Sequence, residues 1–163
     1  MGGGLFISGP DTGVGKSVVA CGLAALLRDG GYRVGVMKPA ETGCLERGGE
    51  LLPQDAVRLK AASGCRESIE KICPYRLRDA LAPSVAAERA DLKIDIDRLM
   101  TLYNEIELTH DVTIDEGAGF DFNQYLELSP ERAFHSHGRG IAMAKALSFD
   151  EITHRRRRPA LVG

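Results

Sequence analysis

A glycine-rich segment near the amino terminus constrains the fold of this chain more than any other feature. The segment, SGPDTGVGKS over residues 8–17, follows the short apolar run LFIS and precedes a stretch with a broad apolar face over residues 17–28. Glycines let successive backbone N–H groups point at a phosphate without Cβ clashes, and a helix that starts at Lys16 adds the positive end of its dipole. This order of strand, glycine-rich loop and helix predicts a phosphate-binding loop.

The spacing of this loop differs from that of the standard phosphate loop. In the pattern G-x-x-x-x-G-K-[ST], Gly9 would lie one residue closer to Gly15 than it does here. Lys16 is placed to reach the terminal phosphates of a nucleotide, and the Ser17 hydroxyl is placed to ligate Mg²⁺. The alternative is a glycine-rich turn with an incidental lysine, but the flanking strand and helix and the Lys-Ser pair favour a variant phosphate loop.

The rest of the pattern predicts an α/β fold with a P-loop NTPase-like parallel sheet and flanking helices. The helix over residues 17–28 stops at Gly30-Gly31, and a second strand follows over residues 32–38, so strand, helix and strand form a βαβ unit. The other expected elements are a loop over 39–53, helices over 54–62, 83–90 and 96–106, a strand over 112–116 and a last helix over 138–147.

Only three strands are expected with this pattern, so the sheet is predicted to be incomplete after the third strand. The strands of a parallel sheet need cover on both faces and partners along their edges. Residues 5–8 are therefore expected to form an exposed apolar edge, which favours self-association and marginal stability.

Composition limits the classes of function. A chain of 163 residues with 44% hydrophobic and 27% charged residues fits one globular domain, and a formal charge of −2 gives no reason to expect a nucleic-acid partner. No apolar run approaches the length that spans a membrane. Four cysteines without a C-x-x-C pair predict reduced thiols in a cytoplasmic protein. His135 and His137 have no further ligands beside them, so we expect solvated side chains and not a metal site.

Four polar side chains near the ends of expected elements are candidates for a binding site. Lys38 closes the second strand and Glu116 closes the third, and open α/β sheets bind ligands at the carboxyl ends of their strands. Asp55 starts a helix, and Thr42 lies in the loop before it. Each has a structural alternative: a surface lysine for Lys38, a solvent-facing carboxylate for Glu116, a helix cap for Asp55 and a turn cap for Thr42.

Six segments give the chain a resemblance to a known family. GPDTGVGKS, VMKPAETGC, PQDAVRL, ICPYRL, APSVAAERA and HDVTIDEGAG stand in the order and approximate spacing seen in dethiobiotin synthetase. The resemblance covers residues 5–119, which correspond to about the first half of that family's enzymes. The longer phosphate loop is itself the form that the family uses.

The resemblance implies MgATP-dependent synthesis of dethiobiotin. An amine of 7,8-diaminononanoate takes up CO₂ as a carbamate, ATP phosphorylates the carbamate, and the second amine closes the ring with loss of phosphate. The implied roles are catalysis for Lys38, Lys16 and Thr12, substrate contact for Thr42, and Mg²⁺ binding for Ser17, Asp55 and Glu116. The implied nucleotide-binding positions are Gly13, Val14, Gly15, Lys16, Ser17, Val18, Asp55, Glu116, Gly117, Ala118 and Gly119. The family works as a homodimer, whereas the oligomeric state of this chain stays open.

The resemblance stops near Gly119. Asp115 and Phe120 stand where the family has an apolar residue and a glycine on either side of EGAG. The segment over residues 115–152 resembles the end of GHKL-type ATPase domains of anti-sigma factors and sensor kinases, in which an Asp contacts adenine and a G-x-G turn lies near the phosphates. The residues that would correspond are Asp115, Gly117, Gly119, Gly138 and Gly140.

Three functions follow from these patterns. The first is an ATP-dependent cyclo-ligase of the dethiobiotin synthetase type, impaired by an incomplete fold. The second is a regulatory ATP-binding or protein-kinase-like module that acts through the tail, and the third is an inactive rearranged fragment joined at EGAG. We expect residues 1–119 to form a phosphate-loop domain and residues 120–163 to form a divergent tail that is no independent domain. Under the first function Glu116 is the essential carboxylate, and under the second function Asp115 is.

Overall fold

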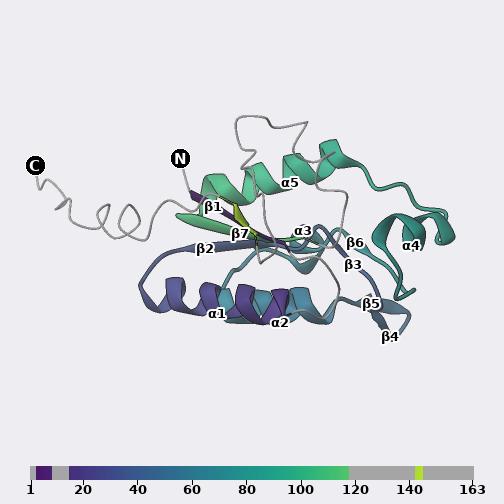
Figure 1. Cartoon of the computed structure of the whole chain (residues 1–163), viewed down its shortest axis with the longest axis horizontal. Helices are drawn as coiled ribbons and strands as arrows, with labels where there is room; N and C mark the ends of the chain where they lie inside the picture. Colours follow the sequence, from purple (N-terminus) through teal and green to yellow (C-terminus); the bar gives the residue numbers. More distant parts are fainter. Residues whose placement is uncertain (1–2, 9–14, 118–141, 145–163) are drawn as a thin grey trace, which may run out of the picture.

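Three parallel strands and one short antiparallel strand form a sheet that carries helices on both faces (Figure 1). The computed structural model describes residues 3–8, 15–117 and 142–144. Its strands are β1 (Gly3–Ser8), β2 (Val34–Met37), β3 (Ala40–Glu41), β4 (Leu45–Arg47), β5 (Glu50–Leu52), β6 (Tyr75–Arg76), β7 (Val112–Glu116) and β8 (Ala142–Ala144). Its helices are α1 (Lys16–Asp29), α2 (Gln54–Ser63), α3 (Ile69–Ile72), α4 (Pro83–Arg89) and α5 (Ile96–Thr109).

The strand order in the main sheet is β2-β7-β1-β8, so β7 lies between two strands that precede it in the chain. It pairs in parallel with β1, where Ile7 is opposite Glu116, and with β2, where Met37 is opposite Asp115. All five residues of β7 are buried, because the strand has a neighbour on each side and helices over both faces. These pairings confirm the predicted parallel sheet and its βαβ unit.

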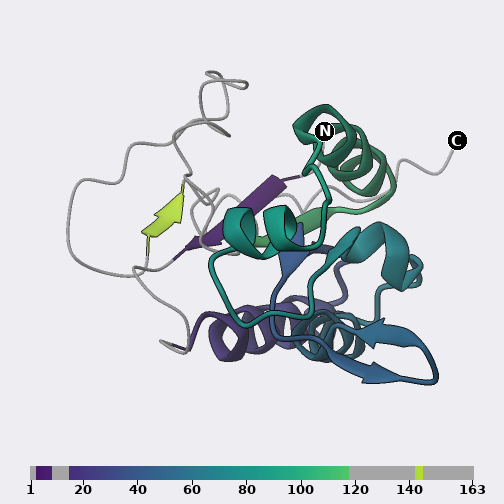
Figure 2. The ribbon, with the colours of Figure 1, turned by 90° about the vertical axis from the view of Figure 1, so that its right-hand side faces the viewer.

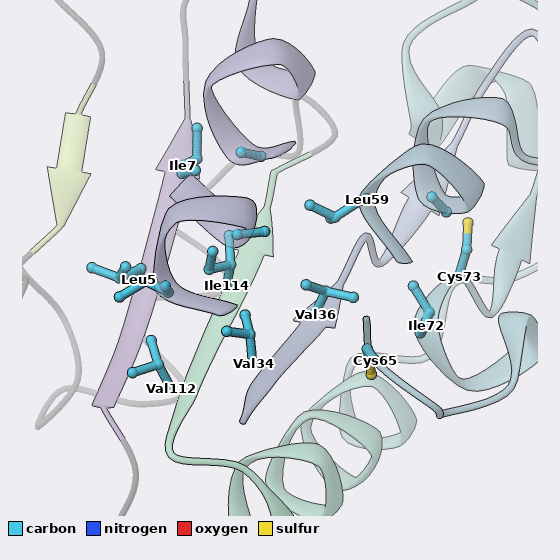
Figure 3. Close-up of a cluster of buried hydrophobic side chains, with 14 residues drawn as sticks. Leu5, Ile7, Val34, Val36, Leu59, Cys65, Ile72, Cys73, Val112 and Ile114 are labelled. Carbon is cyan, nitrogen blue, oxygen red and sulfur yellow. The ribbon is translucent and has the colours of Figure 1, made fainter. Parts of the chain in front are cut away.

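The sheet face toward α1 and α2 carries the larger apolar core (Figure 3). Successive side chains of a strand lie on opposite faces, so alternate residues of the three parallel strands reach this core. Figure 2 shows α1 and α2 side by side beneath the sheet, where α1 buries the small residues Ala20 and Ala24 and α2 buries Leu59. The buried strand residues on this face are Leu5, Ile7, Val34, Val36, Val112 and Ile114.

Two glycines let α5 pack closely on the opposite face. Gly4 and Gly35 are the register partners of Thr113 on the two sides of β7. A Cβ atom at Gly4 would clash with the hydroxyl oxygen of Tyr103, and one at Gly35 would lie 2.6 Å from Cγ2 of Ile106. Larger residues at these two positions would therefore push α5 away from the sheet.

Helix ends follow from local signals in most cases. Gly31, with φ of 83°, follows α1, and Gly64, with φ of 70°, ends α2, as expected for residues that adopt the left-handed conformation at helix ends. Asp95 caps α5 because its carboxylate accepts a backbone N–H of the first turn. Helix α2 starts after Pro53, and no side chain in the cap position accepts a hydrogen bond, as is also true of Gly15 before α1 and Ala82 before α4.

The predicted loop over residues 39–53 is wrong, because this segment contains β3, β4 and β5. Strands β4 and β5 form a hairpin that turns at Gly48 and Gly49, with φ values of 62° and 85°. Positive φ at both central residues is what a tight hairpin turn requires. Strand β3 pairs with β6, and neither β6 nor the one-turn helix α3 was predicted.

The predicted last helix over residues 138–147 is wrong at residues 142–144, which form β8. The rest of that helix lies outside the described residues. Strand β8 pairs with β1 from Phe6 to Ser8 in antiparallel orientation, so the predicted exposed edge is also wrong over those residues. The pairing satisfies backbone groups that an unpaired strand would present to solvent.

The four cysteines are free thiols, as predicted. Burial raises the pKa of Cys44 to about 11 and also raises that of Cys73, so both thiols are protonated at neutral pH. In the part of the chain that the structure describes, no helix combines the length and the apolar character that membrane crossing requires.

Candidate functional site

Four polar side chains from distant parts of the sequence meet at the carboxyl ends of the parallel strands. Lys38 directly follows β2, and Glu116 is the last residue of β7. Ser17 and Asp55 lie in the first turns of α1 and α2, the two helices that pack on the same face. This edge is where open α/β sheets place their ligands.

The distances show one compact cluster. The Ser17 hydroxyl oxygen lies 2.6 Å from Oε1 of Glu116 and 3.0 Å from Oδ2 of Asp55. The Lys38 Nζ atom lies 2.7 Å from the same Glu116 oxygen and 3.7 Å from the same Asp55 oxygen. A hydroxyl group has one hydrogen to donate, so only one of the two carboxylates can accept it at a time.

Charge is concentrated in a part of the cluster that is largely shielded from water. Lys38 is 6% exposed and Glu116 is 1% exposed. Burial by itself lowers the pKa of Lys38, but the charge and hydrogen bond of Glu116, with help from Asp55, outweigh it, so the pKa of Lys38 is raised. Lys38 therefore stays charged at neutral pH, and its ammonium group compensates the buried Glu116 carboxylate.

The donor atoms of this cluster fit Mg²⁺. Oxygen atoms of carboxylates, hydroxyls and phosphates are the ligands that Mg²⁺ prefers, and Mg²⁺ sites often use only one or two carboxylates. Oε2 of Glu116 is buried and has no hydrogen-bond partner among the described residues, so this oxygen is available to bind a cation. The described residues hold no group of three His, Cys, Asp or Glu side chains suited to a metal ion, so this site would depend on two carboxylates and the Ser17 hydroxyl.

The described part of the phosphate loop has the expected local geometry. Gly15 has φ of 95°, a conformation that favours glycine, and its carbonyl oxygen accepts the N–H of Val19 at 3.0 Å to start α1. Lys16 and Ser17 open the helix. The side chain of Val18 is 76% exposed, so only its backbone N–H could serve the site. The predicted positions Thr12, Gly13 and Val14 lie outside the described residues.

The structure describes only the first residue of the predicted glycine segment after β7. The Gly117 N–H donates to the carbonyl oxygen of Ile7 at 2.9 Å, so this amide belongs to the sheet. A Cβ atom at Gly117 would lie 2.7 Å from Cζ of Phe6, which explains the glycine by packing. Ala118 and Gly119 lie outside the described residues, as do Gly138, Gly140, His135 and His137.

Thr42 and Asp115 are the two other predicted polar positions that the structure describes. Thr42 is half-buried in the bend that directly follows β3. Asp115 precedes Glu116 in β7, so the alternation of the strand places it on the opposite face of the sheet, toward α5. Its register partner Met37 belongs to the apolar cluster that α5 covers.

The sequence reasoning missed Glu41, which the structure places beside the cluster. The Glu41 carboxylate accepts the backbone N–H groups of Asp55 and Ala56 at the start of α2. Burial raises the pKa of Glu41, and these two N–H groups and the charge of Lys38 partly offset that effect. The available signal was Pro53, because a helix that starts after proline without a capping side chain needs an acceptor from elsewhere.

Comparisons with known proteins show which family the chain resembles in sequence. Residues 3–126 match the AAA domain family. The chain is 36% identical to the ATP-dependent dethiobiotin synthetase BioD of Thermodesulfovibrio yellowstonii over 119 residues, which are 73% of this chain and 50% of that protein. It is 40% identical over 116 residues to the proteins of the same name from Anaeromyxobacter sp. (strain K) and Bacillus cereus (strain G9842), covering 71% of this chain and 50% and 47% of those proteins. The chain spans about half the length of the curated relatives it matches.

Proposed function

Because this chain belongs to the AAA domain family, we propose that the cluster at the carboxyl ends of its strands binds MgATP and that the chain is a dethiobiotin synthetase. The observation that carries the proposal is the convergence of Ser17, Asp55 and Glu116 beside the ammonium group of Lys38. The names of the relatives support the same reaction. Four free cysteines support a cytoplasmic location for the protein.

In this proposal the phosphate loop and the metal ligands hold the ATP phosphates. Lys16 and the backbone N–H groups over residues 13–18 bind the phosphates, and Ser17, Asp55 and Glu116 hold Mg²⁺. Residues 117–119 belong to the same nucleotide site, although the Gly117 N–H itself serves the sheet. Bound Mg²⁺ neutralises charge on the phosphate oxygens, which with positioning is most of what phosphoryl transfer requires.

Lys38 and two threonines act on the second substrate in this proposal. An amine of 7,8-diaminononanoate adds to CO₂ and loses a proton, giving a carbamate. A carbamate oxygen takes the γ-phosphoryl group of ATP with release of ADP, and the second amine then attacks the carbonyl carbon and expels phosphate. The Lys38 ammonium group stabilises the negative charge of the carbamate and the transferring phosphoryl group. Thr12 and Thr42 contact the substrate.

The proposal extends to the organisation of the chain. Residues 1–119 form the phosphate-loop unit, and residues 120–163 form a divergent tail. A homodimer with substrate near the interface is the expected assembly. A regulatory ATP-binding or protein-kinase-like module and an inactive rearranged fragment are the alternatives. The residues that the GHKL-like pattern needs lie outside the described residues, apart from Asp115 and Gly117.

Calorimetric titration of MgATP into the full chain tests the proposal. Lys16→Ala should weaken binding by about 2 kcal/mol, or roughly thirtyfold, because it removes a charge-assisted hydrogen bond to phosphate. Lys93→Ala is the matched control, because Lys93 is an exposed lysine outside the cluster. An assay with diaminononanoate, bicarbonate and MgATP then measures dethiobiotin. A wild-type chain that binds no MgATP would refute the proposal.

A further inference from the structure

Helix α2 carries Asp55 into the cluster but has no cap of its own. The first N–H groups of an α-helix have no partner within the helix. Pro53 occupies the cap position of α2, and its side chain accepts no hydrogen bond. Pro53 and Ala56 are buried, so water is a poor substitute at this helix end. The start of α2 therefore depends on an acceptor from another part of the chain.

Glu41 of β3 provides that acceptor. Its Oε1 atom accepts the N–H of Asp55 at 3.0 Å, and its Oε2 atom accepts the N–H of Ala56 at 2.9 Å. Glu41 is 7% exposed, so little water competes for these bonds. Its negative charge also lies at the positive end of the α2 dipole, where a carboxylate is favourable. Each carboxylate oxygen thus binds one of the N–H groups that the helix leaves unpaired.

The backbone that carries Glu41 is held in place as well. Its carbonyl oxygen accepts the N–H of Leu77 at 2.8 Å and the thiol of Cys44 at 3.3 Å. Three residues upstream, the N–H of Lys38 donates to the carbonyl oxygen of Ile72 at 2.8 Å. Glu41 therefore connects the first turn of α2 to the same short segment that presents Lys38.

We propose that Glu41 is a positioning residue for Mg²⁺ binding, which it controls by fixing where the Asp55 carboxylate stands relative to Ser17 and Glu116. The proposal rests on the proposed function, because Asp55 is a metal ligand only if the cluster binds Mg²⁺. Mg²⁺ demands nearly ideal octahedral geometry, so a small tilt of α2 would weaken its binding. Arg58 also contacts Asp55, at 3.2 Å, but its side chain is 66% exposed and restrains the carboxylate little.

Mn²⁺ binding to the full chain in the presence of ADP tests this proposal. Electron paramagnetic resonance of free Mn²⁺ gives the Kd for wild type, Glu41→Gln and Glu41→Ala. Glutamine keeps the shape of the side chain and one acceptor oxygen. Its NH₂ group would face the second backbone N–H of α2, which then loses its acceptor. We expect Kd to rise about tenfold in Glu41→Gln and up to about a hundredfold in Glu41→Ala, as for residues that orient metal ligands. In the dethiobiotin assay, the Mg²⁺ concentration for half-maximal rate should rise, and saturating Mg²⁺ should recover most of the rate.

Gly64→Ala is the matched control, because it weakens the other end of the same helix. Gly64 ends α2 with φ of 70°, so alanine is strained there and should lower the melting temperature by a few degrees. Its Mn²⁺ Kd should stay at the wild-type value. The proposal is wrong if Glu41→Gln keeps the wild-type Kd, if it loses cooperative unfolding altogether, or if Gly64→Ala raises Kd as much. A wild-type chain that binds no Mn²⁺ with ADP would instead refute the proposed function.

Discussion

Two neighbouring carboxylates of β7 have opposite surroundings. Glu116 reaches the α1 side of the sheet, where it contacts Ser17 and Lys38. Asp115 lies on the face toward α5, because successive residues of a strand point to opposite faces. A function based on the phosphate loop therefore needs Glu116, whereas a function based on the GHKL-like pattern needs Asp115.

The first prediction separates these two functions. Glu116→Gln should weaken Mg²⁺-dependent ATP binding by about a hundredfold, because a neutral amide is a poor ligand for Mg²⁺ and leaves Lys38 without its buried counter-charge. Asp115→Asn should leave the Kd for MgATP within a factor of about three, or about 0.6 kcal/mol, because Asp115 lies on the face of the sheet opposite to the cluster. Calorimetry with and without Mg²⁺ measures both. The reverse pattern would favour the regulatory module.

The second prediction concerns the ion pair between Arg33 and Asp111 at the start of β2 and β7. Hydrogen bonds from Arg33 hold the pKa of Asp111 below its ordinary value. The pair therefore stabilises the fold at pH values above the ordinary carboxyl pKa, and this contribution is lost as the pH falls through the lowered pKa. Both side chains are exposed to solvent, so water and salt screen the pair and its contribution is small.

Urea unfolding of wild type and Asp111→Asn at about pH 7 and about pH 3 checks this prediction. The variant should be less stable than wild type at the higher pH, and the difference should shrink at the lower pH. A difference that stays constant between the two pH values would show that the charge of Asp111 is not its cause.

At the scale of elements, the glycines beneath α5 set how closely the helix approaches the sheet. Gly35→Ala should destabilise the fold by about 2 kcal/mol, because its Cβ would meet Ile106 at 2.6 Å and Cγ of His110 at 3.0 Å. Gly22→Ala is the matched control in α1, where nothing lies within 4 Å of the new Cβ. This control should stabilise the fold by about 0.5–1 kcal/mol, because alanine is the better helix former. Urea unfolding followed by circular dichroism measures both, and equal effects would contradict the close packing of α5.

The elements that could be predicted well are those long enough to repeat their apolar pattern. Helices α1 and α5 and strand β7 extend over 14, 14 and 5 residues, long enough for the apolar pattern to be read. Strands β3, β4, β5 and β6 have two or three residues, which are too few for alternation to be visible. Only the Gly48-Gly49 pair signalled the hairpin. Strand β8 depends on its pairing with the edge of β1, which no local pattern reveals.

The residues of the candidate site also differ in whether the sequence pattern could predict them. Ser17, Lys38 and Glu116 lie at the ends of elements that could be predicted. Because open parallel sheets bind ligands at the carboxyl ends of their strands, the sequence predicted that these residues share one site. Glu41 could not be found by that rule. It acts through backbone N–H groups 14 and 15 residues away in the sequence, and a β-hairpin lies between. Its contact depends on the path of that hairpin, which the sequence pattern did not predict.

At the scale of the whole molecule, the proposed ligand should stabilise the fold, because its site combines residues from α1, α2, β7 and the segment that follows β2. MgADP at a hundred times its Kd should raise the free energy of unfolding by about 2.7 kcal/mol and the melting temperature by about 5–10 °C. Lys16→Ala should show a much smaller shift at the same MgADP concentration. Differential scanning calorimetry measures both, and an unchanged melting temperature in wild type would contradict nucleotide binding. Marginal stability of the chain without ligand stays a prediction.

The position of β7 has a consequence for how the molecule is made. Lys38 and Glu116 are 78 residues apart, yet they meet because β7 inserts between two strands that leave the ribosome before it. Until residues 112–116 are available, the nascent chain can pair neither strand with its final neighbour. Newly made chains would thus expose two unpaired apolar strands, β1 and β2, until β7 pairs with both. Chaperone binding to the nascent chain should be greatest just before β7 leaves the ribosome.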